Sequence, residues 1–116
     1  MNVVTLIGNL ATEVELKEVG AEQRVAGFLL AVQRPGRDEA DFVWVNAWDR
    51  QAEVCAQYLS KGRRIAVDGR LRSRDWEENG KRRRVVEVVA NRVQFLSPGP
   101  GAEAEAMPFE RAAAAG

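Results

Sequence analysis

Residues 42–48 constrain the fold of this chain most strongly, because they divide into two sets when read as a β-strand, whose successive side chains point to opposite faces. One face carries the small and β-branched residues that suit a packed core, Val43, Val45 and Ala47. The other face carries one amide and three large rings, Phe42, Trp44, Asn46 and Trp48. A row of rings on one strand face is a surface on which nucleobases stack. Aromatic rings also commonly cover a core or a subunit contact, so the strand predicts one of these two uses.

The length of the chain limits it to one core. A chain of 116 residues, of which 46% are hydrophobic, can bury one core and is short for two domains. Residues 97–101 are rich in Pro and Gly and read as a linker. We therefore expect a single domain over residues 1–96 and a flexible tail over residues 97–116.

The residue types that are missing exclude most catalytic chemistry. The chain has no histidine, which removes histidine acid-base catalysis, the common nucleophilic triads and most zinc sites. Its serines lie outside any nucleophile-elbow context, and no glycine-rich phosphate loop is present. Cys55 is the single cysteine, and no N-terminal apolar run resembles a signal peptide or a membrane span. We predict a cytoplasmic, non-enzymatic protein with no cofactor, no metal and no membrane contact.

The charge is balanced overall but unevenly placed. Acidic and basic residues number 17 each, yet residues 61–84 hold ten Lys and Arg against four Asp and Glu. This basic block follows the aromatic strand along the chain. It suits contacts to a phosphate backbone, or it is the solvated surface of a charged hairpin.

The chain before and after the aromatic strand reads as strands and one helix. Residues 3–10 carry apolar side chains on both faces, so this strand requires burial on two sides, and a second copy of the chain would cover one of them. Residues 13–18 alternate and end in a turn, and residues 24–34 form the second main strand. Residues 50–61 have helical composition, with Asp49 as the predicted N-cap.

The last two strands read as a hairpin. Four residues of its first strand are predicted to point inward, Ile65, Val67, Gly69 and Leu71. Three are predicted to point outward beyond them, Arg72, Arg74 and Trp76. Asn79 and Gly80 form a pair favoured by tight turns, so the chain returns through residues 81–96. Five strand regions with one helix predict an all-β protein, a five-stranded OB-fold barrel with one short α-helix between strands 3 and 4.

Several segments together resemble the bacterial single-stranded DNA-binding proteins. The similar segments are residues 1–10, 28–32, 42–53, 58–62, 67–76 and 93–96. The resemblance implies sequence-independent binding of single-stranded DNA during replication, recombination and repair, near the nucleoid. It also implies a homotetramer built as a pair of dimers, and contacts to replication and repair proteins through the C-terminal tail.

The resemblance also implies which residues bind DNA. The family's base-stacking rings fall on Phe42, Trp48 and Trp76, and Trp44 is added because it shares the strand face of Phe42 and Trp48. The family's basic residues that contact the DNA backbone fall on Arg50, Lys61, Arg72 and Arg74.

Two segments depart from the family pattern. No aromatic residue stands near Pro35 and Gly36, where some members carry a stacking ring. Family members commonly end in an acidic segment closed by Pro-Phe, whereas this chain continues past Met107-Pro108-Phe109 for seven residues. The tail therefore reads either as a displaced docking segment or as a disordered, alanine-rich end.

Rival interpretations of the domain remain open at this stage. An RNA-binding OB module would use the same rings and charges, because only contacts to a 2′-hydroxyl distinguish the two sugars. A structural OB domain would use its aromatic residues for assembly instead. A dimer or a monomer is the alternative to the tetramer.

Overall fold

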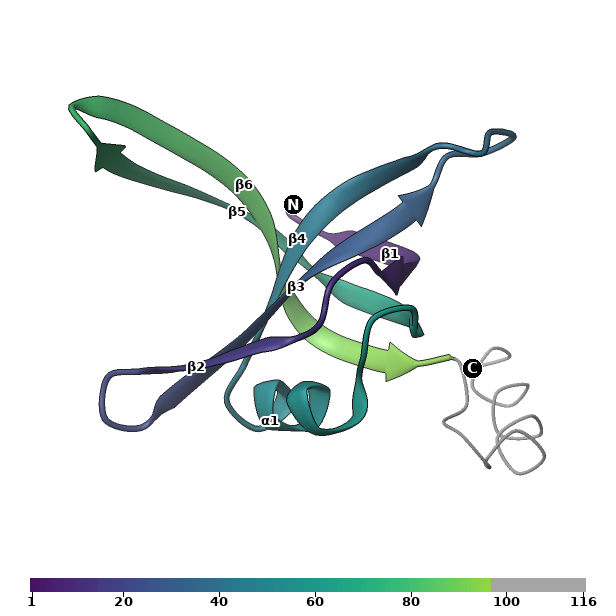
Figure 1. Ribbon diagram of the computed structural model, residues 1–116, viewed down its shortest axis with the longest axis horizontal. Coiled ribbons are helices and arrows are strands. Elements are labelled where there is room, and N and C mark those ends of the chain that lie inside the picture. Colours follow the sequence, from purple (N-terminus) through teal and green to yellow (C-terminus); the bar gives the residue numbers. More distant parts are fainter. Residues whose placement is uncertain (97–116) are drawn as a thin grey trace.

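The computed structural model describes residues 1–96, so the predicted tail and the Met107-Pro108-Phe109 segment lie outside the described residues (Figure 1). The elements in chain order are β1 (Val4–Leu10), β2 (Glu15–Val19), β3 (Gln23–Gln33), β4 (Ala40–Trp48), α1 (Asp49–Tyr58), β5 (Arg64–Glu78) and β6 (Lys81–Phe95). None of the helices in residues 1–96 is long and apolar enough to cross a bilayer.

The strands pair into a closed barrel. β1 pairs with β5, β5 with β6, β6 with β4, β4 with β3, and β3 again with β1. The β4–β6 contact is parallel and the others are antiparallel. β2 pairs with β3, beside the end of β1. The predicted all-β OB-fold is confirmed, with β1 and β2 together forming the first of five barrel strands and α1 lying between the third and the fourth.

The break between β1 and β2 has a local cause. The Ala11 N–H donates to the Leu29 carbonyl at 2.7 Å, and the Leu29 N–H in turn donates to the Thr12 hydroxyl at 3.0 Å. A side-chain acceptor therefore replaces the backbone acceptor for one step of the ladder, and the chain changes direction there.

The hydrophobic core lies inside the barrel. Its largest fully buried apolar side chains come from β3, β4, β5 and β6: Phe28, Leu30, Val45, Ile65, Val67 and Val88. α1 packs against β3 and β4 and buries Ala52 and Cys55. The predicted two-faced first strand is also present, since Leu10 is buried whereas Val3 and Ile7 are 67% and 50% exposed.

Two local predictions are wrong. Asp49 is the first residue of α1 rather than its N-cap, with φ of 54°, and the cap residue is Trp48, which makes no side-chain cap hydrogen bond. Leu71 shares a strand face with the buried Val88, its partner across the β5–β6 hairpin, but is itself 46% exposed rather than packed in the core. There the Asn2 side chain pairs with both backbone polar groups of Leu71 at 2.8 Å, as a strand neighbour would. Figure 1 shows this hairpin projecting well beyond the barrel.

Candidate nucleic-acid interface

An open groove of about 490 Å³ crosses the outer face of four strands. β2 contributes Glu15, Lys17 and Val19, and β3 contributes Val25 and Gly27. β4 contributes Trp44, Asn46 and Trp48, and β5 contributes Arg72 and Arg74. The core residues of β4, Val45 and Ala47, point the opposite way, which is the division that strand periodicity predicts.

One end of the groove is organised around Trp44. Its Nε1–H donates to Asn46 Oδ1 at 3.0 Å, and Asn46 is only 8% exposed. The indole lies against the backbone of Gly27, because a Cβ built there would be 2.6 Å from Trp44 Cζ2 and 3.1 Å from Asn46 Oδ1. Gly27 was absent from the predicted site, although a glycine inside a strand commonly marks such a close approach.

Two arginines lie over two of the predicted rings. The Arg72 guanidinium carbon is 5.9 Å from the centroid of the Trp48 ring, and that of Arg74 is 5.4 Å from the centroid of the Trp76 ring. A cation at this distance is attracted by the ring quadrupole. β4 and β5 therefore bring rings and positive charges together along one face, as the sequence predicts for these four residues.

A buried carboxylate that the sequence interpretation missed lies beside both arginines. Glu87 on β6 has no exposed surface, and its Oε1 accepts from Arg72 Nη2 at 2.7 Å and from Arg74 Nε at 3.0 Å. Burial raises the pKa of Glu87, but the hydrogen bonds from Arg72 and Arg74 outweigh it and hold the pKa below its ordinary value. The acid is therefore ionised at neutral pH and cancels part of the arginine charge.

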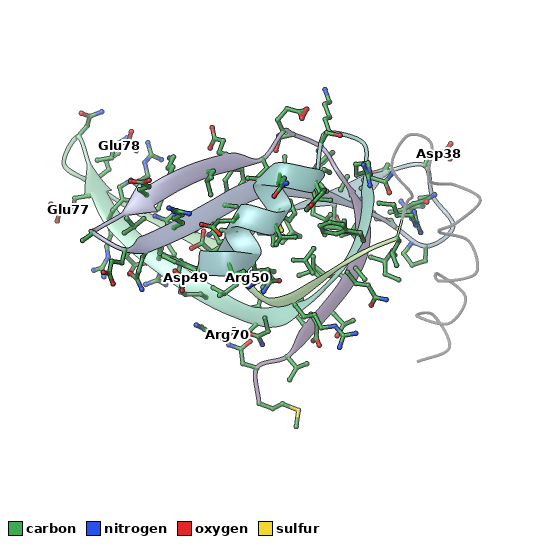
Figure 2. All side chains as sticks on the ribbon, turned by 90° about the horizontal axis from the view of Figure 1, so that it is seen from below. Asp38, Asp49, Arg50, Arg70, Glu77 and Glu78 are labelled. Atoms are coloured by element: carbon green, nitrogen blue, oxygen red, sulfur yellow. The ribbon has the colours of Figure 1, made fainter. Side chains whose placement is uncertain are left out.

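Four predicted site residues lie outside the groove lining: Phe42, Arg50, Lys61 and Trp76. Trp76 is 41% exposed on β5, two residues beyond Arg74. Phe42 is 61% exposed on β4, beyond Trp44. Arg50 is exposed in the first turn of α1, where Figure 2 shows it beside Asp49. Lys61 lies in the turn before β5, where its backbone N–H donates to the Glu13 carboxylate at 3.1 Å.

The other face of the hairpin holds part of the basic block in ion pairs. Asp75 faces away from Arg74, because adjacent strand residues alternate, and it accepts from Arg84 Nε at 2.9 Å and Arg82 Nη2 at 3.1 Å. The hydrogen bonds from Arg84 and then Arg82 hold the pKa of Asp75 below its ordinary value. Figure 2 places Glu77 and Glu78 at the tip of the same hairpin. The charge is thus sorted by face, with Arg72 and Arg74 on the groove side.

Comparison with known proteins gives the family. The model of the single-strand binding protein family matches residues 1–96. This chain belongs to the single-strand binding protein family. A single-stranded DNA-binding protein of Clostridium tetani is 47% identical over 105 residues, covering 85% of this chain and 72% of that protein. Single-stranded DNA-binding protein 3 of Clostridium acetobutylicum is 46% identical, covering 85% of this chain and 73% of its own length.

A third relative extends the comparison. The single-stranded DNA-binding protein of Halalkalibacterium halodurans is 44% identical over 104 residues, which cover 84% of this chain and 62% of that protein. The predicted resemblance is confirmed, and the family is a DNA-binding rather than an enzymatic one.

Proposed function

We propose that this protein binds single-stranded DNA without reading its sequence. The observation that carries the proposal is the alternation of indole rings and guanidinium groups along β4 and β5, with ring-to-cation distances of 5.9 and 5.4 Å. Bases would stack on Trp44, Trp48 and Trp76, and phosphates would be neutralised by Arg72 and Arg74. Membership of the single-strand binding protein family supports the choice of ligand.

The geometry favours unpaired strands over duplex. Stacking needs a free base face, and a base inside a duplex has none to offer. Every base has such a face, so the same groove accepts any sequence. The expected cellular use is protection of separated strands in replication, recombination and repair.

Three further predicted residues, Phe42, Arg50 and Lys61, would extend the DNA path. Phe42 offers an exposed ring on the same strand face as Trp44. Arg50 and Lys61 are exposed basic residues on the segments that follow β4, and each would contact the phosphates of a longer DNA strand. Replacing any of these three residues should therefore leave the affinity for short oligonucleotides that only fill the groove unchanged. The same replacement should weaken the binding of long oligonucleotides.

The free edge of β1 supports self-assembly. β1 pairs with β5 over Val4–Asn9, but within residues 1–96 its other edge pairs with β3 only at Asn9 and Leu10. An unpaired strand edge is a template for another chain, and the exposed Ile7 side chain would gain a cover. We propose that two copies pair there and that two such dimers form a homotetramer, with the dimer as the simpler alternative.

The division of the chain is also proposed. Residues 1–96 would act as the DNA-binding domain, and residues 97–116 as a tail whose Met107-Pro108-Phe109 segment contacts replication and repair proteins. A truncation after Leu96 should keep single-strand affinity and lose only the binding of those proteins.

The function is tested by competition. Fluorescence anisotropy of a labelled oligo-dT bound to the protein should fall when unlabelled single strands of any base composition are added. An equal length of duplex should leave the signal unchanged. Displacement of the labelled oligo-dT by duplex at the same concentration would refute the proposed function.

A further inference from the structure

Glu87 is on the groove side of β6 although it is completely buried. In the antiparallel β5–β6 hairpin it stands directly opposite Arg72, and directly opposite residues share a face. Its neighbour Val88 points into the core. The carboxylate is thus covered from outside the barrel, where Arg72 and Arg74 are its hydrogen-bond partners.

One oxygen of this carboxylate receives both arginines. Oε1 accepts from Arg72 Nη2 and Arg74 Nε, while Oε2 is buried without a hydrogen-bond partner among residues 1–96. A buried charge is costly unless it is paired, and here two guanidiniums supply the pairing through a single oxygen. The ionised carboxylate therefore binds both guanidiniums at one point.

Those groups are the two guanidiniums that lie over tryptophan rings. Arg72 reaches the Trp48 ring on β4, and Arg74 reaches the Trp76 ring farther along β5. Holding a flexible arginine side chain over a ring costs rotamer entropy, and a further anchor offsets that cost. The side chains of Arg72 and Arg74 are 33% and 54% exposed, and the shared carboxylate oxygen is their common anchor.

We propose that Glu87 is a positioning residue for single-strand binding, which never touches DNA but fixes both guanidiniums beside Trp48 and Trp76. The inference rests on the proposed function. It adds that the spacing of cations and rings is set by a buried acid, and that this acid also withholds one unit of positive charge from the phosphates.

The first test separates position from charge. Arg74→Lys keeps the positive charge but removes the Nε–H donor and the planar group that lies over Trp76. We expect affinity for oligo-dT to fall about tenfold, the factor for one hydrogen bond to a charged group, with an unchanged salt slope. Arg84→Lys is the matched control, because it breaks the equivalent bond to Asp75 on the far face, and its affinity should stay at the wild-type value.

The second test removes the acid itself. Glu87→Gln keeps the shape of the side chain and an acceptor oxygen but not the charge, so both guanidiniums become available to phosphates. Affinity at high salt should fall about tenfold, and the slope of log affinity against log salt should steepen by roughly 0.7. Asp75→Asn is the control for added charge on the hairpin, and its high-salt affinity should match the wild type.

The outcomes separate this inference from the proposed function. A wild-type protein that does not bind oligo-dT removes the proposed function itself. A wild-type protein that binds, with Arg74→Lys and folded Glu87→Gln binding equally well at every salt concentration, overturns the role of Glu87 alone. Where circular dichroism shows that Glu87→Gln does not fold, the comparison of Arg74→Lys with Arg84→Lys decides.

Discussion

Replacing Gly27 with alanine should displace Trp44 and destabilise the groove. The new Cβ would be 2.6 Å from Trp44 Cζ2 and 3.0 Å from Cε2. The ring must retreat by about 0.9 Å to reach an ordinary carbon contact of about 3.5 Å. This movement also strains the bond from Trp44 Nε1 to Asn46 Oδ1, which now measures 3.0 Å.

The magnitude follows from three contributions. Overpacking costs about 1–3 kcal/mol, and the weakened hydrogen bond about 1 kcal/mol. The lower entropy of the unfolded alanine chain returns about 0.4–1 kcal/mol. We therefore expect Gly27→Ala to lower the free energy of unfolding by about 1–3 kcal/mol in urea denaturation.

A double-mutant cycle identifies the ring as the cause. In a Trp44→Leu background the clash is gone, so Gly27→Ala should cost almost nothing there, and the coupling should be about 1–3 kcal/mol. Equal costs of Gly27→Ala with and without the Trp44 ring would refute the packing that we describe.

Four further predictions concern the site, the core and the free edge. Trp48→Ala should weaken oligo-dT binding by about 1–3 kcal/mol with unchanged circular dichroism, and wild-type affinity would move Trp48 off the site. Replacing Arg72 and Arg74 together by glutamine should flatten the slope of log affinity against log salt by roughly 0.7 for each phosphate that the protein no longer neutralises, and an identical slope would show that neither arginine touches the DNA backbone. Ile7→Asp should lower the mass in sedimentation equilibrium below that of the wild type, whereas an unchanged mass would mean that copies do not pair through β1. Burial raises the pKa of Cys55 from 9.0 to about 11, so ionisation favours the unfolded chain, and stability should fall by roughly 2 kcal/mol as pH rises from about 9 to 11. Cys55→Ala should abolish this fall, and a parallel fall in both proteins would assign it to other groups.

Stability at acid pH should depend on the buried Glu87 and the two arginines that bind it. Here stability falls as pH falls, whereas for Cys55 it falls as pH rises. The pKa of Glu87 is lowered in the folded protein, so its contribution to folding stability is complete above the ordinary pKa of 4.5 and is lost as pH falls below that value.

With no histidine in the chain, no unperturbed side chain titrates between about pH 6 and pH 8. Single-strand affinity should therefore be nearly flat in that window.

Strand periodicity predicted most of the barrel because each face of a strand has a distinct task. Val45 and Ala47 are buried while Trp44 and Trp48 line the groove, as their alternation indicates. Periodicity could not show the Thr12 hydrogen bond that divides the first barrel strand, because that bond depends on a partner strand 17 residues away. It also missed the left-handed start of α1 at Asp49, where the direction change after β4 determines the backbone.

The site was predicted less completely than the fold. Residue types indicated Trp44, Trp48, Arg72 and Arg74, which line the groove. They did not indicate that the other four predicted residues lie outside it: Phe42, Arg50, Lys61 and Trp76. Glu87 was within reach of the sequence, since pairing residues outward from the Asn79-Gly80 turn places it opposite Arg72. A charged residue in a strand is ordinarily solvated, and only the three-dimensional arrangement shows that its neighbours bury it.

Tryptophan fluorescence titration tests the central claim most directly. The three tryptophans all belong to the proposed path, so their emission should be quenched by single-stranded DNA. Single-stranded DNA, duplex DNA and RNA of equal length would be added at two salt concentrations. We predict quenching by single-stranded DNA of any sequence, weaker binding at the higher salt concentration, and no quenching by duplex. Tighter binding of RNA would assign the groove to the other nucleic acid, and an absence of quenching by every strand would contradict the account.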